Sequence, residues 1–77
     1  MFDIDIFASR LRAVREARNL SRKEVAELLG VTKTQINDLE NGKTGTSMAR
    51  LVILAEFYKV STDYLLGITD DPTWRGK

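Results

Sequence analysis

A short run of residues between positions 33 and 38 carries a dense mixture of hydrogen-bond donors and acceptors. Its polar members are Lys33, Thr34, Gln35, Asn37 and Asp38. Among the partners that such groups can bind are the edges of DNA bases: lysine can donate to guanine, asparagine can bind two atoms of adenine, and aspartate can accept from cytosine. The same composition also fits a helix face that meets only water. The choice depends on the elements that hold these residues.

Helices are the elements expected to hold this run, because apolar residues recur along the chain at helical rather than alternating spacing. Phe7, Leu11 and Val14, for example, form one apolar stripe. Gly, Asn or Ser residues interrupt the pattern at positions 19–21, 30, 41–42, 45 and 60–61. The predicted helical segments are about residues 5–18, 21–30, 32–41, 47–59 and 61–67. Asp5 is expected to cap the first of them.

The second and third segments form a helix-turn-helix pattern. Each opens with a capping box, in which Ser21 pairs with Glu24 and Thr32 pairs with Gln35. Gly30 can adopt the left-handed conformation that ends the first of the two helices. A short turn of this kind sets the second helix steeply across the first, so that its outer face can enter the major groove of DNA.

A helical wheel of the third segment separates a buried side from an exposed side. At about 100° per residue, Ile36 and Leu39 share the inner side, whereas Asn37 and Asp38 face outward. The N-terminal part of a recognition helix is the part that reaches base edges. The residues expected to read bases are therefore Lys33, Thr34, Gln35, Asn37 and Asp38.

Three stretches of the chain carry linked motifs. Residues 20–32 read LSRKEVAELLGVT, residues 36–43 read INDLENGK, and residues 60–67 read VSTDYLLG. Together they resemble the helix-turn-helix family of lambda repressor and Cro, over about residues 7–67. The resemblance implies an all-α fold: a compact five-helix lambda-repressor-like domain whose helix-turn-helix consists of helices 2 and 3.

The resemblance also implies a function and a domain organisation. The chain is expected to be a sequence-specific DNA-binding transcriptional regulator, a repressor that binds a palindromic operator on double-stranded DNA as a homodimer. The domain would comprise residues 1–67, and the aperiodic tail of residues 68–77 reads like the start of a linker. Two alternatives stay open: an antitoxin-type or other protein-binding module on the same fold, or the N-terminal DNA-binding domain of a longer regulator.

Phosphate contacts would position such a domain without reading sequence. The family often has Gln at the position of Arg22, where the side chain contacts a phosphate, and an arginine can make that contact with a full charge. The residues expected at phosphates are Arg22, Thr32, Asn41, Lys43 and Ser47. Residues 44–46 lack the basic side chains with which some phage repressors enter the minor groove. Arg10 and Arg12 are expected to be solvated.

A structural ion pair is also implied by the resemblance. Phage repressors of this family pair an arginine of the first helix with a glutamate after the recognition helix, and Arg15 and Glu40 match those positions. The pair would tie the recognition helix to the first helix. Removing one partner would leave a buried charge unpaired, at a cost of about 3–5 kcal/mol.

Composition narrows the class of protein. The 77 residues include no Cys and no His, which excludes disulfides and removes the usual acid–base and metal-binding side chain. An enzyme, a metal site, a cofactor and a small-molecule ligand are therefore not expected. Residues 9–50 carry nine Lys or Arg against five Asp or Glu, although the chain as a whole has a net charge of only +1. No apolar run could span a membrane, and a cytoplasmic, nucleoid-associated protein of a prokaryote or phage is expected.

The fourth segment is apolar on more than one side. Its inner face is expected to contain Met48, Leu51, Val52, Ala55 and Tyr58. Ile53 and Phe57 then fall on the outer side, and Tyr64 and Trp74 add aromatic surface. Self-association through these four residues is one reading. In the other, Phe2, Ile4, Ile68 or Trp74 folds back to cover Ile53 and Phe57 within one chain.

Overall fold

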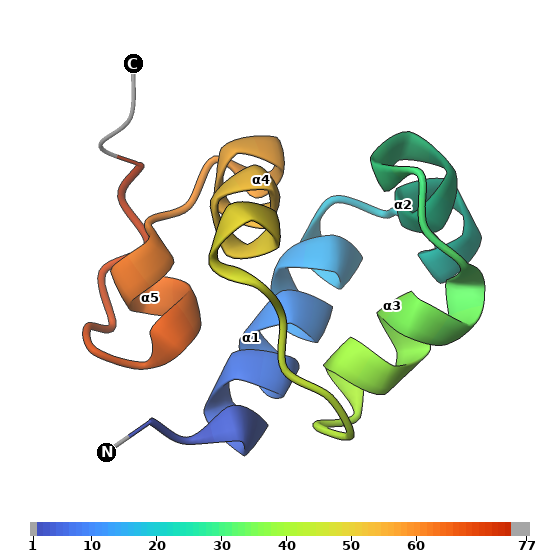
Figure 1. The fold of residues 1–77 in the computed structure, drawn as a ribbon. Coiled ribbons are helices and arrows are strands. Elements are labelled where there is room, and N and C mark those ends of the chain that lie inside the picture. Colours follow the sequence, from blue (N-terminus) through green and yellow to red (C-terminus); the bar gives the residue numbers. More distant parts are fainter. Residues whose placement is uncertain (1, 75–77) are drawn as a thin grey trace.

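The computed structural model describes residues 2–74, and this part of the chain contains five helices joined by short turns (Figure 1). The helices are α1 (Ile4–Ala17), α2 (Arg22–Leu29), α3 (Lys33–Glu40), α4 (Met48–Tyr58) and α5 (Thr62–Leu66). The predicted all-α fold is confirmed. In the described residues, no helix is both long and apolar enough to cross a lipid bilayer.

Helix α1 is the central element of the fold. It packs against α3 on one side and against α5 on the other, while α2 packs on α3 and α4 packs on α5. The α2–α3 pair therefore lies at the opposite end of the molecule from α5 (Figure 1). One apolar core joins all five helices, and its largest fully buried side chains are Phe7, Val25, Leu54, Tyr58 and Leu65.

Side-chain caps begin the helices, and one cap differs from the prediction. Asp3, not Asp5, caps α1: its carboxylate accepts hydrogen bonds from the amides of Asp5 at 2.9 Å and Ile6 at 3.4 Å. Asp5 lies inside the first turn, where a negative charge still favours the positive end of the helix. The predicted capping boxes of α2 and α3 are both present.

The predicted inner face of α4 is right at Ala55 and Tyr58 and wrong at Met48 and Val52. Met48 is 85% exposed and Val52 is 48% exposed, whereas Leu54 is buried together with Ala55 and Tyr58. The helix is apolar on most sides, so its sequence has no polar face to indicate which side meets the core. The side that packs is decided by contact with the rest of the domain.

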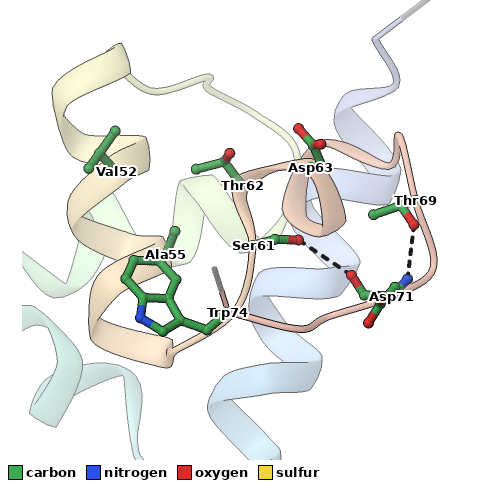
Figure 2. A pocket seen from close by; sticks show the side chains of 8 residues that line it. All are labelled: Val52, Ala55, Ser61, Thr62, Asp63, Thr69, Asp71 and Trp74. Atoms are coloured by element: carbon green, nitrogen blue, oxygen red, sulfur yellow. Dashed lines mark hydrogen bonds between the residues drawn. The ribbon is translucent and has the colours of Figure 1, made fainter. Parts of the chain in front are cut away.

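The segment after α5 does not leave the domain before Trp74. Thr73 forms a β-bridge with Val60, and the amide of Ser61 donates to the carbonyl of Pro72 at 3.2 Å. Figure 2 shows Trp74 beside Ala55 of α4, at the edge of a cavity of about 420 Å³. The segment thus contacts the rest of the domain at Val60 and Ser61, although residues 70–73 are themselves exposed.

Candidate nucleic-acid interface

Helix α3 has one buried side and one polar side. Ile36, Leu39 and Glu40 are buried, with exposed fractions of 3–5%. The five predicted base-reading residues lie on the remaining surface. Lys33, Thr34 and Gln35 are exposed. Asn37 and Asp38 are half-buried. All five therefore lie on the part of α3 that the core leaves uncovered.

The capping box at the start of α3 restricts two of the predicted DNA contacts. The Thr32 amide donates to Gln35 Oε1 at 2.9 Å, and the Gln35 amide donates to Thr32 Oγ1 at 3.1 Å. The side-chain carbonyl of Gln35 thus already accepts one hydrogen bond, and its amino group remains free to donate to a base. The Thr32 hydroxyl accepts one hydrogen bond and keeps its own proton to donate.

The turn between α2 and α3 depends on small residues. Gly30 has a φ of +70°, in the left-handed region that glycine enters without steric cost. The amide of Val31 then donates to the carbonyl of Ala26 at 3.0 Å, which closes the end of α2. Ala26 itself is only 4% exposed, so a larger side chain there would push the two helices apart.

A buried ion pair ties α3 to α1. Arg15 Nε donates to Glu40 Oε2 at 2.7 Å, and Arg15 Nη2 donates to Glu40 Oε1 at 3.1 Å. The third nitrogen, Nη1, donates to the carbonyl of Leu20 at 2.8 Å. Hydrogen bonding to Glu40 raises the pKa of Arg15 above its ordinary value, although burial acts in the opposite direction. The structure thus brings together the two residues that the resemblance pairs.

A second arginine joins this pair. Arg22 Nε donates to Glu40 Oε1 at 3.1 Å, which places the first residue of α2 beside the last residue of α3. Reasoning from the sequence assigned Arg22 to phosphate and missed this contact. A cation and an anion 18 positions apart carry no local signal, because their meeting depends on how α2 crosses α3.

Three other predicted phosphate contacts, Asn41, Lys43 and Ser47, lie between the end of α3 and the start of α4. Asn41 and Lys43 follow the helix and are exposed. Between them, Gly42 has a φ of +72°, and a β-carbon there would lie 3.0 Å from the carboxylate of Asp5. The end of α3 therefore closes against α1. Ser47 caps α4 instead, where its hydroxyl oxygen accepts from the Arg50 amide at 3.1 Å.

The four predicted self-association residues have different surroundings. Ile53 is 49% exposed on α4. Phe57 is half-buried, with its ring in edge-on contact with Tyr58. Tyr64 lies under the guanidinium of Arg10 at 4.3 Å, and Trp74 is half-buried within the same chain. Only Ile53 keeps about half of its surface exposed.

The expectation that Arg10 is solvated is wrong. Its Nη1 donates to the carbonyls of Tyr64 and Thr69, each at 2.5 Å, and its Nη2 pairs with Asp70 at 2.6 Å. Arg10 therefore fastens the segment after α5 to α1. Sequence reasoning missed this role because the partners lie 54–60 positions away.

A comparison with models of known protein families decides the family of the chain. The model described as "Helix-turn-helix" matches residues 11–65, which span α2, α3 and α4, the second half of α1 and most of α5. The chain belongs to this helix-turn-helix family. The predicted resemblance to the class of lambda repressor and Cro is thereby confirmed.

Individual relatives agree with this assignment. The chain is 40% identical over 67 residues to an uncharacterized HTH-type transcriptional regulator, YobD of Bacillus subtilis, covering 87% of this chain but only 60% of YobD. It is 32% identical to the control protein C.SmaI of Serratia marcescens, covering 80% of this chain and 74% of C.SmaI. Among solved structures, the restriction-modification controller protein C.AhdI of Aeromonas hydrophila superposes with a TM-score of 0.74 at 28% identity, over 82% of this chain and 96% of C.AhdI.

Proposed function

We propose that this helix-turn-helix domain is a sequence-specific DNA-binding transcriptional regulator that inserts α3 into the major groove of double-stranded DNA. The observation that carries the proposal is the two-sided character of α3. Its apolar side is anchored in the core, while Lys33 and Thr34 are exposed and Asn37 is half-buried. Membership of the family supports the same reading. Such a regulator acts in the cytoplasm at the nucleoid.

The proposed DNA contacts fall into two classes, base contacts and phosphate contacts. Lys33, Thr34, Asn37 and Asp38 read bases, with a smaller contribution from the amino group of Gln35. The phosphate contacts orient the domain on the duplex and contribute most of the affinity that does not depend on sequence. They come from Arg22, Thr32, Asn41, Lys43 and Ser47.

Binding to one duplex chosen by selection tests this function. Fluorescence anisotropy would compare a duplex enriched from a random pool with a scrambled duplex of equal length. We expect the enriched duplex to bind about 10³-fold more tightly or better, and both affinities to fall steeply as salt rises. Equal affinity for the two duplexes would contradict sequence-specific binding.

We further propose that the regulator acts as a homodimer on a palindromic operator, as a repressor, through apolar residues of α4. Met48, Val52 and Ile53 are all about half exposed or more. Exposed apolar clusters on small proteins commonly mark contact surfaces. A second copy is the partner that a two-fold symmetric operator requires.

Sedimentation without DNA tests the dimer. We expect a concentration-dependent dimer that Ile53→Glu converts to a monomer without loss of helix content. Leu28→Glu is the matched control, since Leu28 is 65% exposed and belongs to α2 rather than α4. A wild-type monomer at every accessible concentration would contradict the α4 dimer and favour a different protein partner for this surface.

A further inference from the structure

Glu40 contacts two arginines that differ in how many of their guanidinium nitrogens donate to protein acceptors. All three guanidinium nitrogens of Arg15 donate hydrogen bonds to protein acceptors. Arg22 donates only Nε, and its side chain remains 27% exposed. Among residues 2–74, nothing else pairs with the Arg22 guanidinium, so its two Nη groups are available.

The charges of Arg22 and Glu40 each lie at the unfavourable end of their own helix. Arg22 is the first residue of α2, where the helix dipole is positive, and Glu40 is the last residue of α3, where it is negative. Each therefore gains from a partner of opposite sign outside its helix. Glu40 supplies that partner to Arg22 from a side chain that is only 2% exposed, so the anion is fixed in place.

The geometry of a guanidinium decides what this contact leaves free. The group is planar, and an acceptor at Nε leaves the pair Nη1 and Nη2 on the far edge. That pair can donate two parallel hydrogen bonds to a phosphate. An arginine held before binding also loses less conformational freedom when the phosphate arrives than a freely rotating one.

We propose that Glu40 is a positioning residue for DNA binding: it holds Arg22 by Nε so that the two Nη groups meet a backbone phosphate. Arg15 holds Glu40 in turn, so a single carboxylate links α1, the end of α3 and the phosphate contact of α2. This inference rests on the proposed function, and it assigns to Glu40 a role beyond joining two helices.

A double-mutant cycle read in DNA affinity tests the positioning role. The variants are Arg22→Gln, Glu40→Gln and the double variant, measured by anisotropy on one duplex. We expect Arg22→Gln to weaken binding about tenfold or more. Glu40→Gln should weaken binding in the wild-type background and cause no further loss when Arg22 is already Gln. Equal losses in both backgrounds would overturn the inference.

A second variant avoids any change to the buried carboxylate. Lysine has one ammonium group, which cannot hold Glu40 and a phosphate in the fork that a guanidinium allows. We therefore expect Arg22→Lys to bind nearly as weakly as Arg22→Gln, although it keeps the charge. Arg22→Lys binding as tightly as wild type would overturn the inference even if Glu40→Gln fails to fold.

The control variant is Arg12→Gln, which removes the same charge from an exposed arginine of α1. We expect it to bind like wild type. A wild-type protein that binds no duplex would overturn the proposed function and this inference with it. A wild-type protein that binds DNA while the cycle is additive would overturn only the role of Glu40.

Discussion

Arg15 and Arg12 lie on the same helix and have opposite surroundings. Arg15 is 7% exposed and donates to Glu40 and Leu20, whereas Arg12 is about half exposed, 4.0 Å from Glu16. We expect Arg15→Ala to lower the free energy of unfolding by about 3 kcal/mol, the lower end of the range for a broken buried pair, because Glu40 keeps Arg22 as a partner. Arg12→Ala should cost less than about 1 kcal/mol. Thermal unfolding followed by circular dichroism measures both, and equal melting temperatures would contradict the buried pair.

Ionisation of Tyr58 is expected to lower the free energy of unfolding at alkaline pH. Burial raises the pKa of Tyr58 to about 12 from an ordinary value of 10.0. Because the folded-state pKa is the higher one, the neutral phenol stabilises the fold fully below pH 10. That contribution is lost as the pH rises from about 10 to 12, and it amounts to roughly 2–3 kcal/mol.

The Tyr58→Phe variant separates this loss from other alkaline effects. We expect wild type to lose more stability than Tyr58→Phe between pH 9 and pH 11.5 in urea unfolding experiments. Tyr64→Phe is the matched control, since Tyr64 is only half-buried, and it should behave like wild type. An identical alkaline loss in Tyr58→Phe and wild type would show that another group is responsible.

At the scale of elements, the capping boxes determine where α2 and α3 begin. The Ser21 hydroxyl accepts from the Glu24 amide at 3.0 Å, and the Glu24 carboxylate accepts from the Ser21 amide at 3.0 Å. We expect Ser21→Ala to cost about 1 kcal/mol in urea unfolding, because an amide of α2 loses its acceptor. Ser9→Ala is the control: its hydroxyl donates only to a carbonyl within α1, so the change should be neutral or slightly stabilising. Equal costs for the two variants would contradict the cap.

The elements differ in how far their sequence determines them. The boundaries of α2 and α3 follow from Ser21, Gly30 and Thr32, because each makes its hydrogen bonds within a few residues. The rotation of α4 was predictable only in part, because Met48 and Leu54 are both apolar and only packing tells them apart. The polar side of α3 was predictable because Ile36 and Leu39 define the opposite, buried side.

At the scale of the whole molecule, some contacts join residues that are far apart in the sequence, and local sequence patterns do not predict them. Arg10 reaches Thr69 and Asp70 across the length of the chain, and Trp74 rests beside α4 (Figure 2). No periodicity marks residues 68–74, so their packing could not be read from the sequence. The same limit hid the contact of Arg22 with Glu40, which depends on the crossing of two helices.

The central claim is that the exposed side of α3 reads DNA sequence in two symmetric half-sites. Selection of bound duplexes from a random pool tests this claim most directly, with wild type, Asn37→Ala and Lys43→Ala compared. We predict that wild type enriches an inverted repeat with half-site centres about 34 Å apart, or about 10 base pairs. Asn37→Ala should lose the preference at one position per half-site, whereas Lys43→Ala should enrich the same sequence with weaker binding. A pool with no enriched sequence, or one that Asn37→Ala leaves unchanged, would contradict the claim.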